Sequence, residues 1–212
     1  MQYASPGTVE EAVSMLADAG PDGRILAGGT DLLVQLRSGI FHPGVVVDVK
    51  RIEEMTAIVE NASGFQIGAA VCAAVLGEHE GLGAQWPGVV EAARLIGSEQ
   101  IQSRASLGGN LCNGSPAADT VPAMIAAGAI CNVVGPDGRR EVPVQDVVTG
   151  PGQTSLTAGE IVASFSIPAQ SPKSGDAYLR FIPRTEMDIA VVGSGVNLTL
   201  GDDGTVAAAR VG

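Results

Sequence analysis

The segment of residues 101–122, IQSRASLGGNLCNGSPAADTVP, constrains the fold more than any other part of the chain. Gly108 and Gly109 lack a Cβ, so this stretch can take positive φ values and let a ligand approach the backbone closely. We therefore expect a loop whose consecutive N–H groups face a phosphate, with the Asp119 carboxylate beside hydroxyl groups of the same ligand. A plain surface turn is the alternative, because Gly, Asn, Ser and Pro are the usual turn residues. Short polar side chains in the segment can hydrogen-bond to a ligand: Asn110, Asn113 and Ser115.

A second glycine segment comes earlier in the chain, at residues 24–37 (RILAGGTDLLVQLR). Its GGT sequence at 28–30 stands between a short apolar stretch and a pattern that predicts a helix over residues 32–36. A helix that begins after a glycine turn offers unpaired N–H groups and the positive end of its dipole, which favour a pyrophosphate. The segment lacks the third glycine of the dinucleotide fingerprint and the Gly-Lys-Ser/Thr of a P-loop. Two such segments, far apart in the sequence, predict one long ligand held from two sides.

Together, these segments resemble the FAD-binding (medium) subunit of the molybdenum hydroxylases, the family of xanthine dehydrogenase and aerobic carbon monoxide dehydrogenase. The flavin domain of that family is of the p-cresol methylhydroxylase (PCMH) type. The similarity runs through nearly the whole chain in one order. The matching residues are 27–31 (AGGTD), 106–111 (SLGGNL) and 115–119 (SPAAD), with weaker matches at 150–154, 159–162, 183–184 and 188–190.

The resemblance implies an oxidoreductase component that binds FAD non-covalently and transfers electrons. The organic substrate is then oxidised at a molybdenum cofactor on a large partner subunit, and 2Fe-2S clusters on a small iron–sulfur subunit carry the electrons onward. The FAD passes them to NAD, O2 or a quinone. No catalytic side chain and no metal ligand is expected in this chain. A stand-alone flavin oxidase of the same fold class and a non-redox nucleotide-binding remnant are the alternatives.

The resemblance also implies which residues bind the cofactor. Arg180 is expected to contact the flavin, and the alternative for it is a solvated charge on a strand. Ile161 or Val162 is expected to pack near the adenine or the flavin ring. The pyrophosphate is expected at the first glycine segment: Leu26, Ala27, Gly28, Gly29, Thr30, Asp31 and Leu32. The other side of the diphosphate and the ribityl chain are expected at the second: Ser106, Gly109, Asn110, Cys112, Asn113 and Asp119.

Composition limits the remaining classes of protein. The 212 residues carry a net charge of −11, which argues against a nucleic-acid partner, since neutralising phosphates takes Lys/Arg patches. Gly and polar residues interrupt the longest apolar runs, and at the N-terminus no charged region leads into an apolar one, so no secretory leader is expected. We therefore expect a cytoplasmic protein without a membrane span. Cys72, Cys112 and Cys131 show no Cys-x-x-Cys spacing, so neither a disulfide framework nor a metal site is expected.

Residues 1–56 predict a small α/β lobe. The TVEE sequence that begins at Thr8 is a capping box, which marks the N-terminus of a helix. Short apolar strands at 24–27 and 45–49 flank the 32–36 helix, and this β-α-β order is typical of parallel strands.

Residues 57–172 predict a larger, mostly antiparallel β lobe with helices. The GPDG sequence at 135–138, between two strand patterns, indicates a hairpin. Both lobes together, residues 1–172, are expected to form an α+β fold, the PCMH-type FAD-binding domain, with FAD between the lobes.

Residues 173–212 contain strand patterns around a GDDG turn. Members of the family continue here into a complete C-terminal domain, so this part is expected to be the opening of a truncated domain. A strand without a partner at a sheet edge favours association. The expectation is therefore a homo-oligomer or a further chain that completes the C-terminal domain.

Overall fold

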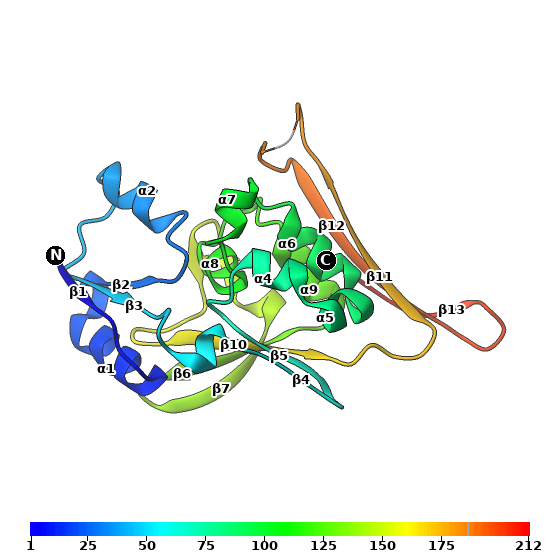
Figure 1. Cartoon of the computed structure of the whole chain (residues 1–212), viewed down its shortest axis with the longest axis horizontal. Helices are drawn as coiled ribbons and strands as arrows, with labels where there is room; N and C mark the ends of the chain where they lie inside the picture. The colour runs from blue at the N-terminus through cyan, green and yellow to red at the C-terminus, as the bar shows by residue number, and fades with distance from the viewer. Residues whose placement is uncertain (186) are drawn as a thin grey trace.

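The N-terminal part of the chain folds around a small parallel sheet. Its strands are β1 (Gln2–Ala4), β3 (Val45–Asp48) and β2 (Gly23–Leu26), in the order β1-β3-β2. Helix α1 (Val9–Ala19) begins as the capping box predicts, because the Thr8 hydroxyl accepts from the Glu11 N–H at 3.2 Å. Helix α2 (Leu32–Arg37) connects β2 to β3 and confirms the predicted β-α-β unit. In Figure 1 it stands away from the sheet, at the upper left.

A five-stranded antiparallel sheet forms the base of the larger lobe. Its central strand, β10 (Ile161–Pro168), is buried along nearly its whole length, so apolar side chains cover both of its faces. The turn that joins β6 to β7 is the predicted hairpin. The sheet order is β4 (Ile58–Asn61), β5 (Gly64–Gly68), β10, β6 (Ile130–Gly135) and β7 (Gly138–Pro143).

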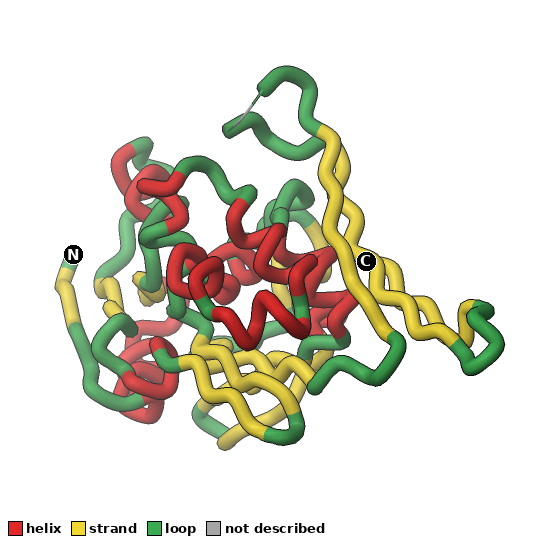
Figure 2. The backbone as a smooth tube through the Cα atoms, turned by 45° about the vertical axis from the view of Figure 1, so that its right-hand side comes forward, coloured by secondary structure: helices red, strands yellow, loops and turns green. Residues whose placement is uncertain are grey.

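Short helices cover one face of this sheet (Figures 1 and 2). Trp86 is buried at their centre, and its indole N–H donates to the Pro168 carbonyl at the end of β10, at 2.8 Å. The helices are α3 (Glu53–Thr56), α4 (Ala73–Glu78), α5 (Glu80–Gln85), α6 (Pro87–Arg94), α7 (Glu99–Gln102), α8 (Leu107–Cys112) and α9 (Thr120–Ala127).

A three-stranded antiparallel sheet follows at the C-terminal end and lies against α6 and α9 (Figure 2). Its inner face buries Tyr178, while its outer face leaves Leu179 and Phe181 exposed. A small hairpin, β8 (Val148–Gly150) with β9 (Gln153–Thr154), precedes β10. The strands of the C-terminal sheet are β11 (Ser174–Phe181), β12 (Val192–Leu200) and β13 (Val206–Val211).

This computed structural model describes residues 1–185 and 187–212. The predicted α+β class, with a small α/β lobe and a larger, mostly antiparallel lobe, is confirmed. The boundary at residue 172 stays a prediction. Within the described residues no helix is both long and apolar enough to cross a bilayer.

Candidate cofactor site

The first glycine segment connects β2 to α2 and presents bare backbone. Gly29 takes a φ of 78°, which side-chain-bearing residues rarely adopt. In the described chain, the N–H groups of Gly28, Gly29, Thr30 and Asp31 donate to no backbone or side-chain acceptor. Consecutive N–H groups around a left-handed residue form a concavity that binds anions. The segment therefore fits the diphosphate of a dinucleotide cofactor.

The second glycine segment is a helix, so the prediction of a loop over residues 101–122 is wrong in its central part. Ser106, in extended conformation, caps α8: its hydroxyl accepts from the Gly109 N–H at 3.2 Å. Its carbonyl accepts from the Asn110 N–H at 2.9 Å, and the Ala69 carbonyl accepts from the Gly108 N–H at 3.0 Å. These N–H groups are used inside the protein and do not form the expected row. Serine at an N-cap stabilises the first turn of a helix, which explains why this segment is helical and not a loop.

Gly108 and Gly109 do not take the positive φ values that glycine allows. Gly108 instead allows α8 to pack against the segment that follows β5, because a Cβ on it would lie 2.6 Å from the Ala69 carbonyl oxygen. At Gly109 a Cβ would meet only the Ser106 hydroxyl, at 3.3 Å. At this pair of glycines another segment of the protein, and not a ligand, approaches the backbone closely.

The two glycine segments nevertheless lie side by side. A Cβ on Gly28 would overlap the carbonyl oxygen of Arg104, which shortly precedes α8. Further along, the Gln35 side-chain amide on α2 donates to the Asn113 Oδ1 at the end of α8, at 3.1 Å. The structure thus brings together the segments that were expected to hold one ligand from two sides.

A lysine that sequence reasoning missed supports the first segment. The Lys50 ammonium donates to the Ala27 carbonyl at 3.0 Å and pairs with the Asp48 carboxylate at 2.8 Å. The Tyr3 hydroxyl donates to the other Asp48 oxygen at 2.7 Å. Burial works against ionisation of Asp48, but hydrogen bonds from Lys50 and Tyr3 outweigh it and hold the pKa below its ordinary value. No spacing motif marked Lys50, since a lysine after a strand is usually a surface residue.

Asn110 and Asp119 make contacts within the protein. The Asn110 Oδ1 accepts from the Thr120 N–H at 3.1 Å and from the Thr120 hydroxyl at 2.7 Å. Asp119 accepts from the Tyr178 hydroxyl at 3.0 Å and from one Arg180 nitrogen at 3.1 Å. The Arg180 and Asp119 side chains are 8% and 12% exposed. The alternative that Arg180 is a solvated strand charge is therefore wrong.

The other expected site residues differ in exposure. Cys112 is exposed at the end of α8 and Asn113 next to it is partly buried. Ile161 and Val162 lie within the hydrophobic core at the start of β10. Contact of either with the adenine or the flavin ring stays a prediction. Around the first glycine segment, Leu26, Ala27, Thr30 and Leu32 are partly buried and Asp31 is exposed.

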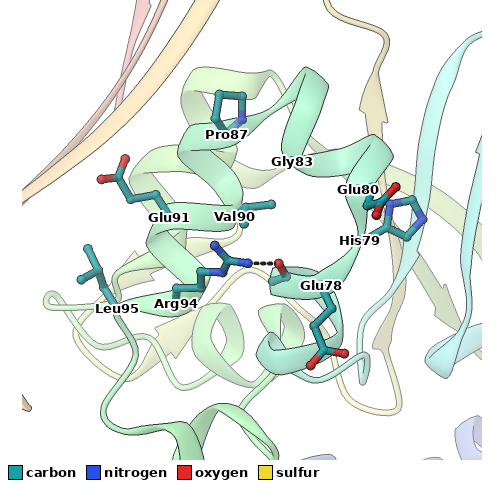
Figure 3. A pocket seen from close by; sticks show the side chains of 10 residues that line it. Glu78, His79, Glu80, Gly83, Pro87, Val90, Glu91, Arg94 and Leu95 are labelled. Carbon is teal, nitrogen blue, oxygen red and sulfur yellow. Dashed lines mark hydrogen bonds between the residues drawn. The ribbon is translucent and has the colours of Figure 1, made fainter.

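A hollow of the described surface lies elsewhere, among α4, α5 and α6 (Figure 3). It has a volume of about 570 Å³ and contains none of the expected cofactor residues. Arg94 donates to the Gly77 carbonyl across it. Three of its lining residues, Glu78, Glu80 and Glu91, are acidic, so it does not suit a diphosphate.

Each lobe contributes one glycine segment, and the two segments meet beside a row of unpaired N–H groups. This arrangement is typical of a protein that binds a dinucleotide-type cofactor. Comparison with known families makes this specific. Residues 1–170 match the family described as the FAD binding domain in molybdopterin dehydrogenase, and the chain belongs to this family. FAD as the cofactor and the predicted family are thereby confirmed.

Named relatives agree with this assignment. The chain is 34% identical over 212 residues to the xanthine dehydrogenase FAD-binding subunit of Escherichia coli O157:H7, covering 99% of this chain and 72% of the relative. It is 33% identical over 195 residues to the carbon monoxide dehydrogenase medium chain of Hydrogenophaga pseudoflava, covering 92% of this chain and 68% of that one.

Solved structures show the same fold. A chain of carbon monoxide dehydrogenase from Oligotropha carboxidovorans superposes with a TM-score of 0.94 at 31% identity, covering all of this chain and 73% of that one. A chain of quinoline 2-oxidoreductase from Pseudomonas putida 86 gives 0.90 at 27% identity, with coverage of 100% and 72%. These similarities confirm the predicted PCMH-type fold.

Proposed function

We propose that this chain is the FAD-binding electron-transfer subunit of a molybdenum hydroxylase. The observation that carries the proposal is the row of unpaired N–H groups at residues 28–31, placed beside α8 in a chain of the FAD-binding family. Such a row is costly to leave without a partner unless water or an anion pairs with it. The FAD diphosphate is the anion that this family supplies.

The two segments have different roles in this proposal. The first binds the diphosphate through its backbone, and Lys50 holds that backbone in place through the Ala27 carbonyl. The second segment forms the opposite wall of the cofactor site, through α8 and the side chains that follow α8. Its N–H groups at Gly108, Gly109 and Asn110 do not contribute, because they donate within the protein. The wall residues proposed to face the cofactor are Ser106, Gly109, Asn110, Cys112, Asn113 and Asp119.

The redox chemistry belongs to the bound FAD, while the protein binds and orients it. We place the molybdenum cofactor on a large partner subunit and the 2Fe-2S clusters on a small one. One relative is named a medium chain, and a similar structure is named a Cu,Mo-CO dehydrogenase. NAD, O2 or a quinone accepts the electrons, and the complex works in the cytoplasm. Substrate specificity then lies with the large subunit.

The experiment that tests this is cofactor binding followed by co-purification. The purified chain is stripped of flavin and titrated with FAD, and the absorption of bound flavin is recorded. We expect one FAD per chain. A chain that binds no FAD would refute the proposal. Affinity purification from the native host should then recover a complex with molybdenum and iron, whereas oxidation of organic substrate by the chain alone would favour a stand-alone oxidase.

The partner or second copy has a candidate surface on the outer face of the C-terminal sheet. Exposed apolar side chains from all three strands gather there, and apolar patches of this kind usually mark protein interfaces. Cross-strand pairing places Phe181 opposite Val192 and Leu200 opposite Val206. We refer to these residues as the outer sheet face: Leu179, Phe181, Val192, Leu198, Leu200, Val206 and Val211.

A further inference from the structure

Asp119 occupies the N-cap position of α9 but does not cap that helix. An N-cap aspartate normally accepts hydrogen bonds from the first N–H groups of its own helix. Here Asn110 of α8 accepts from the Thr120 N–H instead, at 3.1 Å. The α8–α9 junction is thus closed by a side chain of the second glycine segment, and the Asp119 carboxylate is left for another partner.

That partner is strand β11 of the C-terminal sheet. Tyr178, with 1% of its surface exposed, donates its hydroxyl proton to Asp119 at 3.0 Å. Arg180 donates to both carboxylate oxygens at 3.1 Å. A carboxylate this deeply buried is stable only when it is paired and hydrogen-bonded. Burial and the neighbouring Asp119 charge raise the pKa of Tyr178, so its hydroxyl remains a donor.

Two glycines on β12 allow the sheet to reach this position. A Cβ on Gly193 would overlap the Tyr178 hydroxyl, and a Cβ on Gly195 would overlap the Pro122 carbonyl of α9. The strand backbone therefore lies directly on the helix, leaving little freedom for the sheet to shift relative to α9. The position of β11 therefore determines where Tyr178 and Arg180 hold the Asp119 carboxylate.

We infer that Tyr178 and Arg180 are positioning residues of the FAD site, which act through Asp119 to hold the wall formed by α8 and α9. Both lie outside residues 1–170, which match the FAD-binding family. The inference rests on the proposed function and adds that the C-terminal sheet is part of the cofactor site. It differs from the expectation that Arg180 touches the flavin itself, because both Arg180 contacts described here are to Asp119.

The test is a double-mutant cycle on FAD affinity, measured by quenching of flavin fluorescence during titration of the flavin-free chain. Tyr178→Phe keeps the ring and removes one hydrogen bond, so we expect FAD binding to weaken by about 3- to 10-fold. Arg180→Met leaves a buried carboxylate unpaired, so we expect a loss of about 10- to 100-fold, partly restored in Arg180→Lys. Asp119→Ala removes the shared acceptor, and the double variant Asp119→Ala with Tyr178→Phe should bind no more weakly than Asp119→Ala alone.

The matched control is Asp202→Ala, the same chemical change at the far end of the same sheet. Asp202 is fully exposed and pairs with Lys173 at 2.7 Å, so the control should bind FAD as the wild type does. Additive losses in the double variant would overturn the inference, since the residues would then act independently of Asp119. Wild-type affinity with a lowered melting temperature in Tyr178→Phe, which should fold even where Arg180→Met does not, would also overturn it. Failure of the wild-type chain to bind FAD would refute the proposed function, and the inference with it.

Discussion

Gly28 is the residue at which the two glycine segments come closest. Alanine at this position would place a methyl group on the Arg104 carbonyl oxygen, so the segments would have to separate. We expect Gly28→Ala to lower the free energy of unfolding by about 1–3 kcal/mol. We also expect FAD affinity to fall by at least about 10-fold, because the diphosphate loses its second wall. Urea denaturation and FAD titration measure the two effects.

Gly83→Ala is the control for this change. No heavy atom lies within 4 Å of the position that its Cβ would take in α5, so alanine should stabilise the helix by about 0.5–1 kcal/mol. FAD affinity should not change in it. Unaltered FAD binding in Gly28→Ala would show that the contact between the segments does not shape the site.

Glu160 gives the chain an acid-sensitive contact directly before β10. Hydrogen bonds from Arg140, at 2.6 and 2.8 Å, lower the pKa of Glu160 to about 2 from an ordinary 4.5. Because the pKa is lower in the folded protein, the stabilisation is complete above the ordinary value and is lost as the pH falls toward 2. With Arg140 partly exposed, we expect the contribution to be about 1–2 kcal/mol.

Denaturation with urea at a series of acidic pH values measures this contribution. Glu160→Gln should lower the free energy of unfolding near neutral pH and flatten its decline in acid. Glu141→Gln, at an exposed position on the same strand as Arg140, is the control and should leave the curve unchanged. A variant Glu160→Gln with the same pH dependence as the wild type would contradict the assignment.

The glycine pairs show how far single residues can be interpreted from sequence. The Gly-Gly pair of the first segment forms a turn, as predicted, in which Gly29 is left-handed, but the Gly-Gly pair of the second segment is helical. Both sequences suit either conformation. The difference comes from the Ser106 cap and from the packing of Gly108 on Ala69, a contact between distant parts of the chain that no local pattern contains. The proximity of the segments was predicted only because one ligand was expected to join them.

At the scale of elements, helix α2 is the least supported part of the site. It has six residues and none of them is buried, while Leu33 and Val34 are 54% and 64% exposed. A helix this short is not stable by itself in water. The Gln35–Asn113 hydrogen bond ties it to α8. We therefore expect its order to depend on the cofactor that binds at its N-terminal side.

Trypsin cleavage after Arg37, in the last turn of α2, reports on this order. FAD should slow the cleavage by about 10-fold or more, since cleavage requires local opening. Gln35→Ala should accelerate it in the flavin-free chain. Gln102→Ala, which removes a side-chain hydrogen bond to the Arg94 carbonyl on another helix, is the control. Equal cleavage rates with and without FAD would show that the cofactor does not order α2.

Elements with strong local signals were predicted, among them α2 with its six residues, whereas three other short helices and strand β1 were not. Capping at Thr8 marked α1, and turn residues marked the β6–β7 hairpin. By contrast, α5, α7 and α8 have four to six residues each, too few for a helical period to emerge from the sequence. Strand β1 was missed for the same reason, since its three residues gain their place by pairing with β3.

At the scale of the whole molecule, the outer sheet face and the charge of −11 act in opposite directions on self-association. The apolar side chains favour contact, whereas like charges repel two copies at low salt. Leu179→Thr with Phe181→Thr should therefore change the melting temperature of the isolated chain little, because both side chains are already exposed. It should weaken association with a second copy or a partner chain.

Light scattering after size-exclusion chromatography, at low and high salt, measures the self-association, and co-purification measures the partner. Val59→Thr, an exposed change on strand β4 of the other sheet, is the control. If the outer-face variant associated as strongly as the wild type, the interface would lie elsewhere on the molecule.

The central sheet also carries a row of polar side chains. Ser164 on β10 is fully buried, and its hydroxyl accepts from Gln66 on β5 at 3.2 Å and from Asn132 on β6 at 3.0 Å. Slippage of β10 by one residue would turn the Ser164 hydroxyl to the opposite face of the sheet and separate it from both amides. These hydrogen bonds therefore favour the native register of β10 against β5 and β6. Since these hydrogen bonds need no flavin, we expect the apoprotein to fold first and to bind the cofactor afterwards.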